Sequence, residues 1–185
     1  MYKLIKASEI GLVESLHFSI ELMKKSLEAT LCVYDQPGTI RHYLDREDFV
    51  RLLLPWLESF PVQNFISNFF ASKSFFVIYL RSRSPLKNQG QQEFHRDWFV
   101  AKERLEVFIA LDEINQENGP LEVSTSDGLS KIIEMNPGDT CLIDAEVLHR
   151  GTKNLSGKCR RLISLHIGSQ LRENENYVSY FKVGD

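Results

Sequence analysis

The second half of the chain is a series of short strand-like segments separated by turn residues, and this pattern constrains the fold more than any other feature. SFFVIYLRSR, at residues 74–83, is rich in the β-branched and aromatic residues that strands favour. Asn-Gly, Asp-Gly, Pro-Gly and Ser-Gly pairs separate the later segments. Several short strands with such turns favour a sandwich or barrel. The further expected strands are 104–114, 119–126, 131–137, 139–145 and 160–169.

The first 73 residues have a different pattern, with apolar residues at helical spacing. Ser8 is a candidate N-cap for the first expected helix. Pro55 should bend or end the second, because proline lacks the N–H that a helix interior needs. Pro61 is expected in the first turn of the third, where proline is tolerated. The expected helices are 9–31, 46–60 and 61–70.

Length and composition predict a single globular domain over residues 1–185, with a mainly helical part at 1–73 and a jelly-roll core at 74–170. The chain is 43% hydrophobic and 25% charged, as folded proteins usually are. Its net charge of −3, without a basic run, disfavours nucleic-acid binding. No apolar stretch approaches the roughly 20 residues of a membrane span. We therefore expect neither a nucleic-acid nor a membrane partner.

Cysteine usage and the N-terminus favour a cytoplasmic location. The three cysteines are widely spaced, so neither a disulfide framework nor a paired-cysteine zinc site is visible. The first residues, MYKLIKASEIG, lack the continuous apolar core of a signal peptide.

The segment EFHRDW, at residues 93–98, contains the first candidate site residues. If it enters a strand, His95 and Asp97 point to one face and Arg96 to the other. A histidine and an aspartate two residues apart are a weak metal signal by themselves. His17 and His42 lie in or next to expected helices and are interpreted as surface or packing residues.

A third candidate ligand and a candidate anion-binding residue follow in the second half. His149 ends the segment DTCLIDAEVLHRG, and Arg160 opens the last expected strand eleven residues later. Two histidines and one aspartate form a facial triad, typical of non-haem Fe(II) oxygenases, although zinc accepts the same ligands. An inward arginine is costly unless it meets an anion, which indicates a carboxylate-bearing cosubstrate. The structural alternative is that His149 ends a hairpin and Arg160 pairs with Asp144 or Glu146.

These residues resemble the phytanoyl-CoA dioxygenase family of Fe(II)/2-oxoglutarate-dependent oxygenases across about residues 75–168. The order of the motifs carries the resemblance more than any single motif does. The motifs are HRD at 95–97, FIALDEINQENGPL at 108–121, GDTCLIDAEVLHRG at 138–151 and the strand that begins with Arg160.

The resemblance implies a mainly β fold, a double-stranded β-helix of the cupin-like jelly-roll type, preceded by helices. It implies that His95, Asp97 and His149 bind Fe(II), and that Arg160 holds the distal carboxylate of 2-oxoglutarate. The reaction would oxidise a small-molecule substrate with O₂ while 2-oxoglutarate is decarboxylated to succinate and CO₂. From the resemblance, Ser164 and Phe108 are further expected cosubstrate contacts.

In FFVIYLRSR, at residues 75–83, Val77, Tyr79, Arg81 and Arg83 alternate onto one face. If that face is inward, Tyr79 or Arg81 could contact the cosubstrate or an acidic substrate, as could Gln92 before His95; the alternative is a strand whose polar end leaves the barrel.

Two features bear on the substrate and the reaction. The family often has Pro-Gly-Ser-His after the strand that ends near residue 123, in a loop that borders the substrate pocket. Here the stretch is Ser124-Thr125-Ser126-Asp127. Asp97 is present, which disfavours the halogenase variation, in which a small residue replaces the carboxylate.

Two other classes of protein remain as alternatives. One is a metal-dependent cupin-like enzyme that does not use 2-oxoglutarate, and Arg160 argues against it. The other is a binding module that keeps the triad without turnover, and no residue distinguishes it from the oxygenase.

Overall fold

The structure of the protein is a computed structural model. It describes residues 1–11, 17, 19–25, 33–36, 39–43, 47–72, 74–85, 90–97, 103–156, 158, 160–171, 173, 175, 177 and 179–182; within these ranges the side chains of residues 33–36, 39–43, 47–50, 79–85, 179 and 181 are not described.

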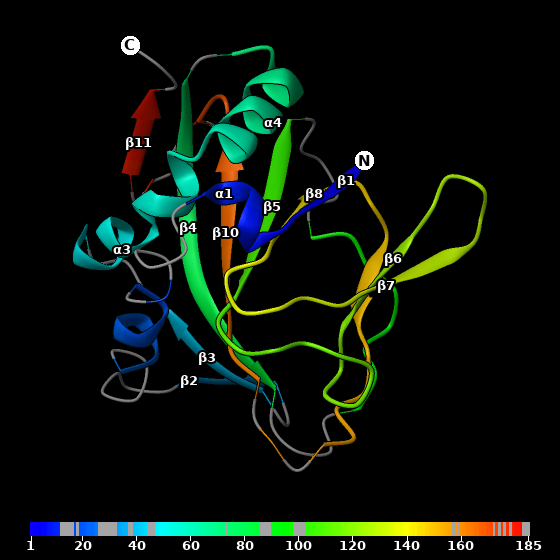
Figure 1. Cartoon of the computed structure of the whole chain (residues 1–185). Helices are drawn as coiled ribbons and strands as arrows, with labels where there is room; N and C mark the ends of the chain where they lie inside the picture. The colour runs from blue at the N-terminus through cyan, green and yellow to red at the C-terminus, as the bar shows by residue number, and fades with distance from the viewer. Residues whose placement is uncertain are drawn as a thin grey trace.

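Two antiparallel sheets face each other, which gives the mainly β jelly roll expected from the sequence (Figure 1). The large sheet has the strand order β1-β8-β5-β10-β4-β3-β2, and β11 also pairs with β4. The small sheet has the order β7-β6-β9. The strands are β1 Tyr2–Ile5, β2 Val33–Gln36, β3 Thr39–Tyr43, β4 Ser74–Pro85, β5 Arg104–Ala110, β6 Leu121–Ser124, β7 Ser130–Ile133, β8 Thr140–Asp144, β9 His149–Gly151, β10 Leu162–Gly168 and β11 Ser179–Lys182.

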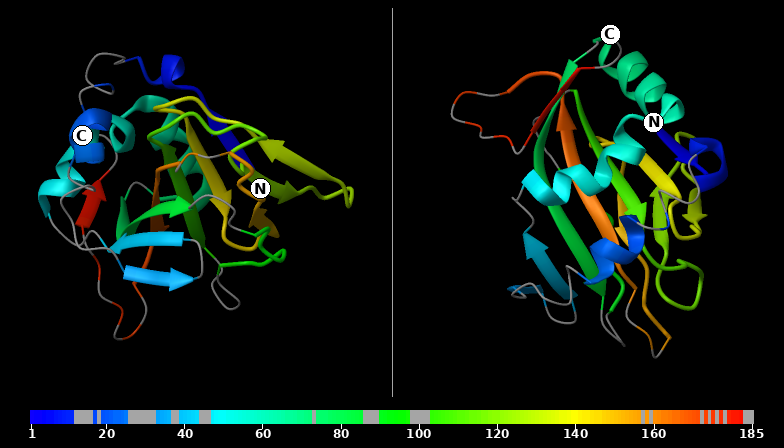
Figure 2. Two further views of the ribbon diagram at one scale, coloured as in Figure 1. Left: turned by 90° about the horizontal axis from the view of Figure 1, so that it is seen from below. Right: turned by 60° about the vertical axis from the view of Figure 1, so that its left-hand side comes forward.

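Helices cover one face of the large sheet, and the small sheet covers the other (Figures 1 and 2). Apolar residues of α3 and α4 pack against alternate residues of β5 and β10, such as Val107 and Leu165. The intervening residues of the same strands, such as Phe108 and Leu162, pack against the small sheet. The named helices are α1 Ala7–Ile10, α3 Glu47–Leu57 and α4 Phe60–Phe70, and residues 19–25 are also helical.

The second and third expected helices are confirmed. α3 ends at Leu57, two residues after Pro55, and α4 has Pro61 in its first turn. Trp56 anchors the helical layer to the sheet, because its buried indole Nε1 donates a hydrogen bond to the carbonyl oxygen of Gly138, 2.9 Å away.

The expected first helix is wrong at its beginning. Residues 2–5 form β1, which pairs with β8, and Ser8 lies inside α1 instead of capping a longer helix. Gly11 ends α1 in the left-handed conformation, with φ 81°. The buried carboxylate of Asp139 accepts hydrogen bonds from the ammonium of Lys6 and the backbone N–H of Ala7. These contacts tie the start of the chain to the turn before β8.

The N-terminal part of the chain also supplies strands β2 and β3, which the helical periodicity did not predict. β3 pairs with the second half of β4, and β11 pairs with its first half (Figure 1). No helix within the described ranges is long and apolar enough to cross a membrane.

Candidate metal and cosubstrate site

His95, Asp97 and His149 come together at the small sheet. His95 forms an isolated antiparallel bridge with His149, the first residue of β9. This bridge fixes the register between two segments that lie more than fifty residues apart in sequence. One ligand atom from each of the three side chains lies within 4.8 Å of the others. The His149 ring is buried and the other two side chains are half-buried.

Both histidine rings are oriented by backbone carbonyl groups. Nδ1 of His95 lies 2.9 Å from the carbonyl oxygen of Glu93, and Nδ1 of His149 lies 3.0 Å from that of Val147. A carbonyl oxygen can only accept a hydrogen bond, so each Nδ1 carries the proton. Each Nε2 then keeps its lone pair, and this is the tautomer that a metal ligand needs.

Asp97 completes the donor set. Its Oδ2 lies 3.3 Å from Nε2 of His149, and its Oδ1 lies 3.8 Å from Nε2 of His95. Two neutral imidazoles and one carboxylate suit a divalent transition metal such as Fe(II), and zinc accepts the same atoms. The residues present therefore fit the metal that the sequence predicts.

Arg96, between the two candidate ligands, is exposed. Its Nε donates a hydrogen bond to the carbonyl oxygen of Glu146, 2.7 Å away. The contact connects the segment that carries His95 and Asp97 to the residues just before His149.

Arg160 is buried, with 5% of its surface exposed. Its Nε donates to the carbonyl oxygen of Asn118, 2.9 Å away. The Asn118-Gly119 turn is tightly packed there, since a Cβ on Gly119 would lie 2.6 Å from the carbonyl oxygen of Thr152. Nη2 of Arg160 lies 3.9 Å from the place of a Cβ on Gly151, the third residue of β9. Arg160 thus approaches the strand that begins with His149.

Gln92 lies at the same strand. The side-chain oxygen of Gln92 accepts a hydrogen bond from the backbone N–H of Gly151, 2.8 Å away. The backbone N–H of Gln92 donates to the carbonyl oxygen of Gly151. A side chain at Gly151 would collide with this amide, because its Cβ would lie 2.9 Å from the Gln92 oxygen.

Phe108 and Ser164 face the space between the sheets from neighbouring strands, where they are register partners. The buried Phe108 ring lies edge-on to the His149 ring, with 6.3 Å between centroids. The Ser164 hydroxyl donates to Oε1 of Glu106, 2.7 Å away. The structure therefore places Ser164 against a carboxylate of the chain itself.

Glu106 and His166 belong to the same cluster, and neither was predicted from the sequence as a site residue. Nε2 of His166 lies 3.4 Å from Oε1 of Glu106, and both side chains are buried. One ligand atom from each lies within 4.8 Å of Asp97. In the sequence, Glu106 stands out only as a charged residue in the otherwise apolar run LEVFIA, which does not indicate a role.

Tyr79 pairs through its backbone with His166, and a bulge next to this pair shifts the register so that Val77 pairs with Ile167. Val77 is buried in the helix-side core. The side chains of Tyr79, Arg81 and Arg83 lie outside the described part of the chain, as do Trp98, Phe99 and Cys159.

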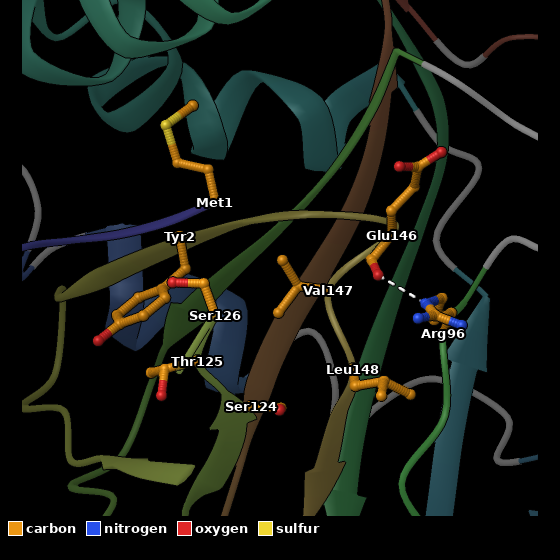
Figure 3. A pocket seen from close by; sticks show the side chains of 9 residues that line it. All are labelled: Met1, Tyr2, Arg96, Ser124, Thr125, Ser126, Glu146, Val147 and Leu148. Atoms are coloured by element: carbon orange, nitrogen blue, oxygen red, sulfur yellow. Dashed lines mark hydrogen bonds between the residues drawn. The ribbon is translucent and has the colours of Figure 1, made fainter. Parts of the chain in front are cut away.

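A cavity of about 480 Å³ lies beside the segments that carry the triad (Figure 3). Ser124, Thr125 and Ser126, from the loop that departs from the family pattern, form part of its wall. Figure 3 shows Arg96 and Glu146 on the opposite side of Val147 from Tyr2. The full lining is Met1, Tyr2, Arg96, Ser124, Thr125, Ser126, Glu146, Val147 and Leu148.

No family model and no curated protein match the sequence, but solved structures match the fold. SnoN, a non-heme alpha ketoglutarate dependent epimerase from nogalamycin biosynthesis, matches with a TM-score of 0.73 and 13% identity over 90% of this chain and 76% of its own. HygX from Streptomyces hygroscopicus, solved with nickel and 2-oxoglutarate bound, matches with a TM-score of 0.67 and 14% identity over 90% and 82%.

AviO1 from Streptomyces viridochromogenes Tue57 matches with a TM-score of 0.65 and 13% identity, over 94% of this chain and 92% of its own. At such low identities the likeness concerns the backbone. The chain therefore has the jelly-roll fold that these proteins share. SnoN is described as dependent on alpha ketoglutarate, and HygX was solved with 2-oxoglutarate bound.

Proposed function

We propose that the chain is a non-haem Fe(II)/2-oxoglutarate-dependent oxygenase, similar to the phytanoyl-CoA dioxygenase family, that acts on a small molecule. It would couple oxidation of that substrate by O₂ to decarboxylation of 2-oxoglutarate, with succinate and CO₂ as coproducts. The fold supports this proposal, because structural neighbours with the same fold are described as dependent on alpha ketoglutarate.

One observation carries the proposal: the triad and the buried arginine come together at one strand, β9. His149 begins β9, and Nη2 of Arg160 approaches Gly151 at its end. Zinc hydrolysis has no need of an arginine at this place. A 2-oxoglutarate molecule requires both a metal to chelate and a cation for its distal carboxylate, and Arg160 has the planar fork that suits a carboxylate.

In this proposal His95, Asp97 and His149 hold the iron, and Arg160 binds the distal carboxylate of 2-oxoglutarate. Phe108 and Gln92 flank the cosubstrate, one beside His149 and the other beside Gly151. The iron, when bound, supplies the O₂ chemistry that amino-acid side chains cannot perform. The chain contributes orientation, because both histidines are set in the ligand tautomer by their carbonyl partners.

A small-molecule substrate is supported by the neighbours. SnoN has been solved with nogalamycin RO and HygX with hygromycin B. Epimerase and carbocyclase neighbours share the cofactor dependence, so we propose oxidation of the substrate without restricting the product to an alcohol.

Anaerobic titration with Fe(II) and 2-oxoglutarate tests the proposal. We expect a weak visible charge-transfer band that needs both components, followed by succinate formation when O₂ is admitted. Arg160→Ala should weaken 2-oxoglutarate binding at least about tenfold, because a charge-assisted hydrogen-bonded pair is lost. Arg51→Ala, an exposed position on α3, is the control and should bind 2-oxoglutarate normally.

The alternatives give different results in the same experiment. Metal binding without the band, and without an effect of Arg160→Ala, would indicate a cupin-like metalloprotein that does not use 2-oxoglutarate. A normal band with no succinate under any condition would indicate a binding module.

A further inference from the structure

Glu106 places a second carboxylate at the metal-binding triad. It lies on β5, its side chain is 0% exposed, and it occupies the same face of the strand as Phe108. Its Oε2 lies 4.0 Å from Nε2 of His149. This Nε2 is the ring atom left for a metal, because Nδ1 faces the carbonyl oxygen of Val147.

The two oxygens of Glu106 have different surroundings. Oε1 accepts a hydrogen bond from the hydroxyl of Ser164 and lies 3.4 Å from Nε2 of His166. Both partners come from β10, so one oxygen is held by the neighbouring strand. That contact orients the carboxylate, and its other oxygen is the one near His149. A buried carboxylate oriented in this way is suited to a cation between Glu106 and the triad.

The two distances measured from Nε2 of His149 are those of ligands around a single ion. Glu106 would turn toward the ion to join all three ligands, because it is not in the set whose ligand atoms lie within 4.8 Å of one another. Metal–ligand bonds of about 2.1 Å in an octahedral site place adjacent ligand atoms about 3 Å apart and opposite ones about 4.2 Å apart. The separation of 3.3 Å between His149 Nε2 and Asp97 Oδ2 is close to the first value. The separation of 4.0 Å between His149 Nε2 and Glu106 Oε2 is close to the second.

We infer that Glu106 is a fourth protein ligand of the resting metal site, and that 2-oxoglutarate takes its place. The inference rests on the proposed function for its second half. Three protein ligands leave three octahedral positions, which 2-oxoglutarate and O₂ fill together. A fourth leaves two, so the Glu106 oxygen must leave the ion before both can bind. The step is an exchange of carboxylate ligands and involves no oxidation.

The exchange has opposite consequences for the two binding partners. A buried negative charge near the metal strengthens binding of a divalent cation. The same charge opposes a dianionic cosubstrate that approaches the same ion. Glu106→Gln removes the charge, keeps the size of the side chain and keeps an oxygen that can accept from Ser164.

The test is anaerobic calorimetry with Mn(II), first alone and then with 2-oxoglutarate added to the metal-loaded protein. We expect one Mn(II) per chain. Glu106→Gln should bind Mn(II) at least about tenfold more weakly and 2-oxoglutarate at least about tenfold more tightly, since one pairwise charge interaction is removed from each. Water-proton relaxation by bound Mn(II) should rise by about half in the variant, as three water positions replace two.

Glu58→Gln is the matched control, with the same change of charge at an exposed position in the helical layer. It should leave the Mn(II) affinity, the 2-oxoglutarate affinity and the relaxation unchanged. Thermal unfolding of both variants without metal separates a folding defect from a ligand effect.

Three results would overturn the inference. They are unchanged affinities in Glu106→Gln, affinities that fall together, or two Mn(II) ions in the unaltered protein, which would place Glu106, His166 and Asp97 around a second ion. Failure of the proposed function looks different. In that case 2-oxoglutarate binds neither the metal-loaded unaltered protein nor metal-loaded Glu106→Gln. The Mn(II) affinity and the water-proton relaxation still report whether Glu106 is a ligand.

Discussion

At the scale of single residues, the rings of the two candidate histidine ligands are oriented in the same way. Each ring places Nδ1 against the carbonyl oxygen of the residue two positions earlier, Glu93 for His95 and Val147 for His149. The contact is local, so it needs only an extended backbone at each histidine. Orientation and tautomer are therefore set by the chain before a metal arrives, which lowers the ordering cost of binding.

Cys141 should be an unreactive thiol. It is completely buried on β8, and burial, together with the nearby Glu106 carboxylate, raises its pKa to about 12. Only the thiolate is nucleophilic, so Cys141 in the folded protein should resist alkylation at neutral pH. A variant with Cys32→Ser and Cys159→Ser leaves Cys141 as the remaining cysteine. We expect no labelling by iodoacetamide in buffer and complete labelling in urea.

The raised pKa of Cys141 also predicts the direction of a pH effect on stability. The folded state favours the protonated thiol, so this contribution is complete below the unfolded pKa of about 8.5 and is lost as pH rises toward the folded value. Above about pH 8.5, the free energy of unfolding of the double variant should fall relative to that of its Cys141→Ala derivative. Denaturant unfolding of both proteins measures this change. Rapid alkylation of the folded double variant would contradict both expectations.

Gly119 should be far less tolerant of substitution than Gly128. Both have positive φ, 86° and 80°, but a Cβ on Gly119 would lie 2.6 Å from the carbonyl oxygen of Thr152, whereas nothing lies within 4 Å of one on Gly128. Gly128→Ala should cost about 1–2 kcal/mol from backbone strain alone. Gly119→Ala should cost more and also displace the carbonyl oxygen of Asn118, which holds Arg160. Equal losses in urea unfolding would contradict this account.

At the scale of elements, a clamp between the end of β5 and the start of β10 positions Arg160. The carboxylate of Asp112 accepts hydrogen bonds from the backbone N–H, Nε and Nη2 of Arg161, at 2.8, 2.9 and 3.0 Å. The N–H of Leu111 donates to the carbonyl oxygen of Arg161. Arg161 is held against Asp112 by these contacts, and its neighbour Arg160 lies near Gly151 of the small sheet.

Asp112→Asn should loosen this clamp. Burial raises the pKa of Asp112, but the hydrogen bonds and charge of Arg161 outweigh burial and hold the pKa below its usual value. Loss of the charged partner should cost about 1–3 kcal/mol at neutral pH. Because the folded pKa is lowered, the contribution of Asp112 is present above the unfolded pKa of about 3.9 and is lost as pH falls below it.

Urea unfolding at pH 7 and at pH 3 measures this dependence. The difference between the native protein and Asp112→Asn should shrink at the lower pH. A difference that stays constant would mean that the carboxylate charge contributes nothing. Asp127→Asn, at an exposed turn, is a comparison in which the free energy of unfolding at pH 7 should change little.

At the scale of the whole molecule, the strands were more predictable than their partners. Alternation and turn residues correctly indicated β4, β5, β6, β7, β8 and β10, because each strand has one face on the helices or on the other sheet. β1 was missed because four residues with one buried side chain carry almost no periodic signal. The bulge in β4 was missed because its position depends on pairing with β10.

The residues of the candidate site also differ in how well the sequence predicts them. His95, Asp97, His149 and Arg160 could be selected from the order of motifs along the chain, and the structure brings the three candidate ligands together. Glu106 could not be selected by motif, because its closeness to His149 follows from the packing of β5 across β9 between the sheets. Strand register also gave Ser164 a partner, Glu106, that spacing from Arg160 does not suggest.

Metal binding should stabilise a chain that is already folded. The largest apolar cluster joins the helices to the large sheet and includes none of the candidate ligands, so the metal-free protein should keep its fold. A metal at a hundred times its dissociation constant adds about 2.7 kcal/mol, which raises the melting temperature of a chain of this size by about 5–10 °C. Thermal unfolding with EDTA and with Mn(II) measures the shift, and His95→Ala should abolish it. An equal shift in His95→Ala would place the metal elsewhere, and unfolding in EDTA alone would make the metal part of the fold, as in small zinc domains.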